Sequence, residues 1–209
     1  MYHLHQALNI IKHTIFKKVC VMSTNSLKIL RPKKQFDVVS IPNPLSKSIQ
    51  GKYFAGQTES LSFSNTTNAW GALVNPTFSG VNLFANVFTI SNFSEKPFLV
   101  QIWFNTNPPG TINVSTKVST ANTALVPHRI PKVQVQFNQN VNGVPLGGIN
   151  VFDRVVPPGT TIASKEDGKF IFPPGGNWVL FLTSPGSEAT TFSAIVAFGW
   201  WEENISLKN

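Results

Sequence analysis

The sequence predicts an all-β fold, an antiparallel β-sandwich of jelly-roll type, with a flexible basic N-terminal arm. Three observations predict it. The 209 residues include 17 Phe and 5 Trp but only 2 Met, a composition that favours strands. They also include 14 Gly and 15 Pro, which supply many chain reversals. From residue 51 onward, short apolar segments alternate with turn dipeptides, and no helical period separates them.

Composition also limits the class of protein. Hydrophobic residues make up 42% of the chain, which is enough to form the core of one domain and excludes global disorder. The single cysteine, Cys20, excludes an internal disulfide and a multi-cysteine zinc site. No run of about 20 apolar residues occurs, so no membrane-spanning helix is expected.

The net charge of +8 is concentrated near the N-terminus. Residues 1–50 contain eight Lys or Arg and one acid, Asp37, which gives +7, whereas residues 51–209 contain nine bases and eight acids, which gives +1. A nearly neutral domain without a clustered basic face is not expected to bind nucleic acid. The basic arm could contact phosphates or an acidic surface, or could simply increase solubility.

The arm itself has two parts. Residues 1–21 carry apolar side chains at helical spacing, which predicts a short amphipathic helix: Leu4, Leu8, Ile11, Ile15 and Phe16. Lysines interrupt this part and no small-residue cleavage site follows it, so a secretory signal peptide is not expected. Alternatively, Met22 is the native start and residues 1–21 are an upstream extension. Residues 23–50 contain three prolines among Ser, Lys and Asn, and predict an extended linker.

Residues 51–209 are predicted to form the sandwich domain. Turn signals such as Asn75-Pro76, Asn142-Gly143 and Pro157-Pro158-Gly159 separate the apolar segments. The predicted strands are, in order, 52–56, 60–64, 68–74, 81–91, 98–104, 111–118, 132–138, 149–156, 160–164, 169–172, 177–183 and 191–201. Many short strands at this spacing are typical of a sandwich or jelly roll.

Three of these strands are apolar on both faces. In 98–104, for example, one face carries Phe98, Val100, Ile102 and Phe104, and the opposite face carries Leu99, Gln101 and Trp103. The segments 177–183 and 191–201 show the same property, and Trp201 lies on the second face of the latter. Because a sandwich buries only one face of each sheet, either loops or a second subunit must cover the other face. Trp103 and Trp201 are therefore the candidate interaction residues.

Residues with acid–base or metal-binding chemistry are sparse. Residues 51–209 contain one histidine, His128, in a turn, and no Gly-x-Ser-x-Gly motif accompanies it. The acidic pair Glu166-Asp167 precedes Gly168 and predicts a hairpin tip, while Glu202-Glu203 predicts an exposed, charged end of the last strand. We expect no catalytic residue, no metal site and no cofactor, and hence no enzyme.

Five motifs stand out in the sandwich domain: GKYFAG at 51–56, NAWGAL at 68–73, the stretch from 152 to 159, GKFIFPPGG at 168–176 and AFGWWEE at 197–203. Together they resemble a family of uncharacterised single-domain proteins from endospore-forming Gram-positive bacteria. The resemblance covers about residues 51–203 and carries no assigned chemistry. It implies a setting at the spore surface, in a parasporal body or in the mother-cell cytoplasm.

Two functions follow as expectations. Low charge, a surface rich in Asn, Gln, Ser and Thr, and two-sided apolar strands indicate a non-enzymatic structural protein that assembles with copies of itself. The alternative is a carbohydrate-binding module in which an exposed aromatic side chain such as Trp103 or Trp201 stacks on a sugar ring.

Overall fold

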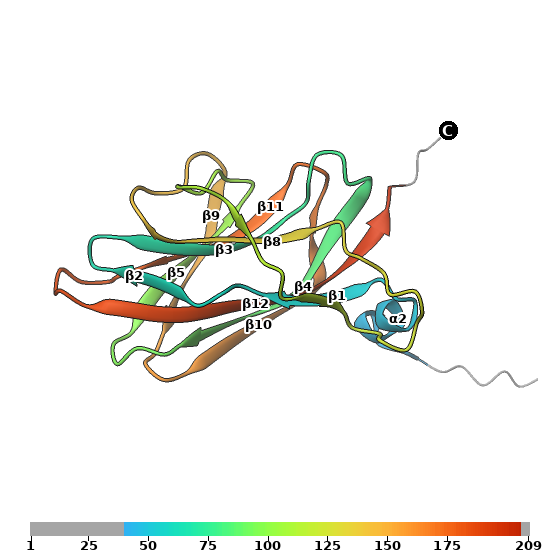
Figure 1. Ribbon diagram of the computed structural model, residues 1–209, viewed down its shortest axis with the longest axis horizontal. Helices are drawn as coiled ribbons and strands as arrows, with labels where there is room; N and C mark the ends of the chain where they lie inside the picture. Colours follow the sequence, from blue (N-terminus) through green and yellow to red (C-terminus); the bar gives the residue numbers. More distant parts are fainter. Residues whose placement is uncertain (1–39, 206–209) are drawn as a thin grey trace, which may run out of the picture. The chain divides into compact units, whose positions relative to one another are not determined.

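The structure is a computed structural model that describes residues 40–205. It confirms the all-β sandwich: two antiparallel six-stranded sheets pack face to face (Figure 1). The strands are β1 (Tyr53–Gln57), β2 (Leu61–Ser64), β3 (Asn68–Val74), β4 (Val81–Asn92), β5 (Phe98–Phe104), β6 (Asn113–Val114), β7 (Val118–Thr120), β8 (Gln134–Val141), β9 (Ile149–Val156), β10 (Thr161–Phe172), β11 (Asn177–Thr183) and β12 (Thr191–Asn204).

The strand order is that of a jelly roll. The first sheet runs β10-β4-β12-β1-β7, with β2 also paired to β12, and the second runs β6-β8-β3-β11-β5-β9. From β1/β2 to β5 the chain changes sheet with each successive connection, and it does so again from β9 to β12. The segments β6, β7 and β8 are an insertion between β5 and β9 that widens both sheets.

The core lies between the two sheets and follows the predicted alternation. In β5 the side chains of Phe98, Val100 and Ile102 are buried, and so are Val133, Val135 and Phe137 in and just before β8. The largest buried side chains include Trp178 from β11 and Trp200 from β12. This burial of apolar side chains on one face of each strand fixes the strand register, because a shift by one residue would turn the apolar face to solvent.

One predicted loop is instead a helix. The sequence predicted extended chain to residue 50, but α2 (Asn43–Ile49) is helical, with Pro44 in its first turn. The helix belongs to the same compact unit as the sheets, which begins at Ser40. The predicted amphipathic helix in 1–21 and the rest of the arm before residue 40 lie outside the described residues.

The predicted hairpin at Glu166–Gly168 is also wrong. The segments 160–164 and 169–172 are parts of one long strand, β10, which pairs with β4 throughout. In that pairing Lys165 lies opposite Val87 and Phe170 lies opposite Ala85, so residues 166–169 form a bulge opposite the single residue Asn86. The turn signal was real, because Asp167 and Gly168 both have positive φ (52° and 76°), but it marks a bulge within a strand rather than a strand end.

Candidate functional site

Trp201, one of the two predicted contact residues, is already buried within the subunit. Its side chain is 2% exposed, and its ring stacks on Phe84 with 5.4 Å between the centroids. The bulge of β10 covers it: a Cβ added at Gly168 would lie 1.8 Å from a Trp201 ring carbon. Trp201 therefore has no exposed surface with which to contact another subunit. The sequence did not show what covers this side chain, and the structure shows that the β10 bulge does.

Trp103 lies on the outer face of the second sheet and is half-buried. It packs beside an outer apolar cluster that includes Trp70, Val179 and Phe181. The chain between β5 and β6 helps to cover this cluster, because the indole Nε1 of Trp70 donates to the carbonyl oxygen of Pro109 at 2.7 Å. Loops thus cover most of the outer apolar face of the second sheet. Trp103 lies at the margin of this face and remains partly accessible.

The side chains that could take part in acid–base chemistry are dispersed. His128 lies in the loop before β8, Asp153 on β9, Glu166 in the bulge of β10 and Glu202 on β12. Within residues 40–205 no three His, Cys, Asp or Glu side chains come close enough together to hold a metal ion. Nor does any helix in that part of the chain have the length and apolarity needed to cross a membrane.

Glu202 is not the exposed strand end that the sequence predicted. It is 8% exposed, and its carboxylate accepts backbone N–H groups from Lys132 and Val133 at 2.9 Å each. The indole Nε1 of Trp200 donates to the same carboxylate at 3.3 Å. These bonds tie the loop before β8 to β12, so the carboxylate has a structural role and is not free to act as an acid or base.

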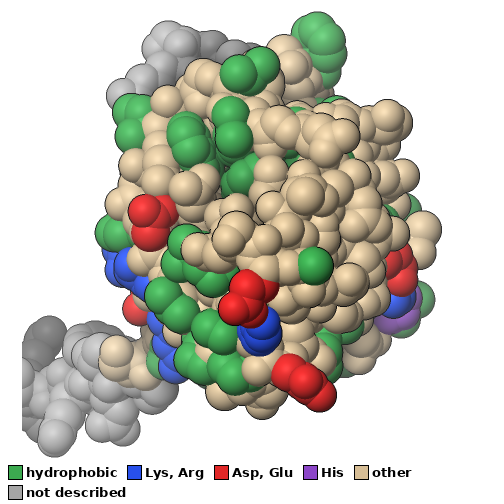
Figure 2. All heavy atoms as spheres, turned by 90° about the vertical axis from the view of Figure 1, so that its left-hand side faces the viewer, with side chains coloured by type: hydrophobic (Ala, Val, Ile, Leu, Met, Phe, Trp, Pro, Cys, Tyr) green, Lys and Arg blue, Asp and Glu red, His purple; other side chains and the backbone are tan. Residues whose placement is uncertain are grey.

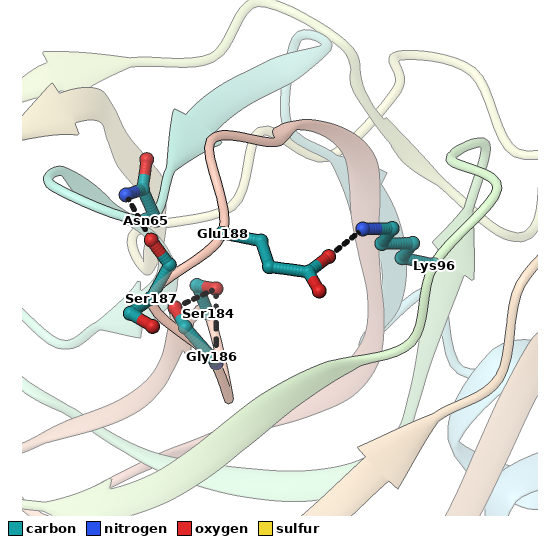
Figure 3. Close-up of polar contacts among 6 residues, drawn as sticks. All are labelled: Asn65, Lys96, Ser184, Gly186, Ser187 and Glu188. Carbon is teal, nitrogen blue, oxygen red and sulfur yellow. Dashed lines mark hydrogen bonds and ion pairs between the residues drawn. The ribbon is translucent and has the colours of Figure 1, made fainter.

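A groove lies at the end of the sandwich where β4 joins β5 and β11 joins β12. It has a volume of about 400 Å³ and is lined by Lys96, Pro97, residues 184–188, Thr190 and Phe192. Figure 2 views this end and shows charged side chains scattered over a largely uncharged surface. Figure 3 shows Lys96 and Glu188 paired across the groove, with Ser184 and Ser187 below.

The polar groups of this groove mostly satisfy one another. Asn65 Nδ2 donates to the Ser187 carbonyl oxygen at 3.0 Å, and the Ser184 hydroxyl bonds to the backbone of Gly186 (Figure 3). The hydrogen bond from Lys96, together with its charge, lowers the pKa of Glu188. A carboxylate held ionised by an exposed ammonium group, with no histidine lining the groove, lacks the partners of a general acid or a nucleophile.

At the opposite end of the sandwich, helix α2 presents its apolar side chains outward. Ile41 just before the helix, and Leu45 and Ile49 within it, recur every four residues and are 49–56% exposed. None of the seven helical residues is buried, and the less exposed positions are Pro44 and the polar stretch 46–48. Leu125 and Val126 are exposed in the loop after β7, and Asn122 in that loop donates to the Ile49 carbonyl oxygen at 3.3 Å.

An ion-pair clamp holds α2 against the sheet. The Glu203 carboxylate receives Lys47 from the helix and Lys52 from the chain before β1, each at 2.6 Å. Desolvation raises the pKa of Glu203, but the hydrogen bonds and charges of the two lysines together outweigh it and leave the pKa below its ordinary value. The helix is thus positioned by charge and backbone bonds, while its apolar side chains remain outside.

We call the five exposed side chains Ile41, Leu45, Ile49, Leu125 and Val126 the helix-end patch. The sequence prediction missed it, because residues 23–50 were interpreted as an extended linker. The signal was present: three aliphatic residues at i, i+4 and i+8 begin beside a proline, which is common in the first turn of a helix. Their spacing predicts one helix face, but only the tertiary structure shows that this face points outward.

Comparison with known proteins agrees with the motif analysis. A family model described as a family of unknown function, DUF6143, matches residues 25–208. The chain belongs to the DUF6143 family. The match extends further toward the N-terminus than the resemblance described above and includes α2 and the helix-end patch. No curated protein and no solved structure matches this DUF6143 chain.

Proposed function

We propose that this protein is a non-enzymatic structural protein that assembles with copies of itself. The observation that carries the proposal is the helix-end patch, in which an entire helix face of Ile and Leu side chains is exposed while α2 buries no residue. Apolar side chains left exposed on one side of a helix mark a contact region, because covering the exposed half of each one contributes on the order of 1 kcal/mol.

The charge balance supports a second copy as the occupant. Residues 40–205, which include the patch, contain nine bases and eight acids and so carry a net charge of only +1, and association of two such domains meets little repulsion. The lysines nearest the patch, Lys47 and Lys52, are paired with Glu203 and do not oppose the lysines of another copy as free charges. Closed, symmetric homo-oligomers are the usual result when a protein carries one self-complementary patch.

The dispersal of the titratable side chains supports the non-enzymatic part of the proposal. A hydrolase needs a nucleophile, a base and an orienting group within hydrogen-bond distance of one another. His128 and Asp153 lie on different elements, and the carboxylate of Glu202 is occupied by backbone N–H groups. A location at the spore surface, in a parasporal body or in the mother-cell cytoplasm is part of the same proposal, and only the family resemblance supports it.

Sedimentation velocity across the micromolar range tests the proposal. Wild-type protein should sediment as an oligomer, and Leu45→Asp should shift it to monomer by placing a charge in the patch. The matched control is Phe93→Asp, because Phe93 is 61% exposed but lies at the other end of the sandwich. A wild type that remains monomeric, or a Leu45→Asp variant that associates as strongly as wild type, would overturn the proposal.

A further inference from the structure

Four outward-facing side chains form an aromatic and polar cluster on strands β5 and β9. Trp103 of β5 lies directly across from Asn150 of β9, and Gln101 lies across from Asp153. All four lie on the face of the second sheet that points away from the core, because the intervening residues Val100 and Ile102 are buried. We call this group the Trp103 cluster. It is separate from the helix-end patch.

The indole of Trp103 lies along the strand rather than standing upright from the sheet. Its Nε1 donates to the side-chain oxygen of Gln101, two residues earlier on the same face, at 3.3 Å. The side chain packs beside Val179 and the rest of the outer cluster. Trp103 is half-buried there, so part of its indole remains accessible to solvent.

The polar neighbours leave hydrogen-bonding capacity unused. Asn150 Nδ2 donates to Asp153 Oδ1 at 2.9 Å, which fixes the amide so that its oxygen has the opposite orientation. That oxygen, Asn150 Oδ1, is buried and has no hydrogen-bond partner among the described residues. Asp153 is exposed, and its second carboxylate oxygen makes no side-chain bond within residues 40–205. Asn150 Oδ1 is covered by the protein and out of reach of a ligand, whereas the exposed carboxylate oxygen of Asp153 can only accept and favours a ligand that brings hydroxyl donors.

We propose that the Trp103 cluster binds a pyranose ring of a glycan, with the apolar face of the sugar stacked on the indole. A sugar hydroxyl group then donates to the free oxygen of Asp153. A pyranose combines an apolar face with a rim of hydroxyls, which matches a partly exposed indole beside an exposed acceptor. This function is additional to self-assembly and uses a different surface.

The charges of the cluster argue against nucleic acid as the ligand. A base could also stack on the indole, but its phosphates would be repelled by the carboxylate of Asp153. The nearest cation, Arg154, is engaged elsewhere: its guanidinium lies 5.0 Å from the centroid of the Phe152 ring and donates to the Asp153 carbonyl oxygen at 2.9 Å. A neutral, hydroxyl-rich ligand meets no such repulsion.

Titration calorimetry with cellohexaose and with the hexamer of N-acetylglucosamine tests the inference. Wild type should bind at least one of them, and Trp103→Ala should weaken that binding by more than about tenfold. Asp153→Ala should also weaken it, and because Asp153 is exposed, this variant should fold normally. Trp201→Phe is the matched control, since Trp201 is buried and should leave affinity unchanged.

Two results would overturn the inference. One is that wild type binds neither oligosaccharide. The other is that folded Trp103→Ala and Asp153→Ala proteins both bind with wild-type affinity. The outcome is independent of assembly, because Leu45→Asp should bind the oligosaccharide as wild type does. A Trp103→Ala variant that loses self-association but keeps glycan affinity would assign the surface to a protein contact instead.

Discussion

The two ends of the sandwich are fastened in the same way but present different surfaces. At the helix end, buried Asn75 donates from Nδ2 to the carbonyl oxygens of Val81 and Phe172, which joins two connections. At the loop end, buried Asn92 donates to the carbonyl oxygens of Lys96 and Val156 and joins two others. Each end thus has one buried amide that holds neighbouring loops together.

Exposed apolar side chains, however, concentrate at the helix end. Besides the helix-end patch, Phe78 between β3 and β4 is 98% exposed and Ile130 before β8 is 87% exposed. The loop end presents Phe93 and a groove lined by hydroxyl groups, an ion pair, two prolines and Phe192. Hydrophobic side chains also reach the surface at the loop end (Figure 2), but the highest exposed fractions, those of Phe78, Ile130 and Val126, lie at the helix end. The apolar side chains of the helix end are available to a partner.

The largest expected effect separates the two tryptophans that the sequence treated alike. Trp201→Ala should lower the free energy of unfolding by about 3–5 kcal/mol, because it leaves a cavity between Phe84 and the β10 bulge. Trp103→Ala, at a half-buried position, should cost clearly less. Urea denaturation of both variants measures the difference, and equal losses would contradict the burial described here.

The next effect concerns the buried carboxylate at the helix end. Glu202→Gln should destabilise the protein by about 1–3 kcal/mol, because an amide cannot accept all the N–H groups that the carboxylate receives. Its neighbour provides the control: Glu203 has a side chain 25% exposed in salt bridges, and Glu203→Gln should cost less than about 1 kcal/mol. Thermal unfolding of the two variants measures both losses of stability. A larger loss for Glu203→Gln than for Glu202→Gln would contradict the structural role given to Glu202.

Substituting the two asparagines compares the ends directly. Asn75→Ala and Asn92→Ala each remove two bonds to backbone carbonyl groups and should each cost about 1–3 kcal/mol. Hydrogen exchange should show lost protection mainly at the end that carries the substitution. If either variant lost protection at both ends, the hydrogen bonds of Asn75 and those of Asn92 would be coupled through the sheets.

The smallest effect is a pH dependence of the helix clamp. The pKa of Glu203 is lower in the folded protein than its ordinary value of 4.5. The clamp's contribution to the free energy of unfolding is therefore fully present above pH 4.5. The contribution is lost as the pH falls through the lowered folded-state pKa, and it should amount to less than about 1 kcal/mol. Denaturation of wild type and Glu203→Gln from pH 7 to pH 3 should show two stabilities that converge at acidic pH. A constant difference would exclude the clamp as its source.

The sequence by itself determined the sandwich and most of its core. Alternating apolar residues place Val133, Val135 and Phe137 inside, and turn dipeptides locate the strand ends. Both signals are local: the strand has a two-residue period, and Gly, Pro and Asn adopt turn conformations wherever they stand. The outward position of Trp103 on its strand was also evident.

Only the tertiary structure decided what covers the second faces and ends of the strands. The bulge at residues 166–169 covers Trp201 from a strand that is a neighbour in space but distant in sequence. Glu202 is buried because the loop before β8 brings two N–H groups to it, and α2 points its apolar side chains outward because Lys47 meets Glu203. Whether a side chain is buried depends on residues distant in the sequence. The local pattern of apolar and polar residues does not show which of these residues it will contact.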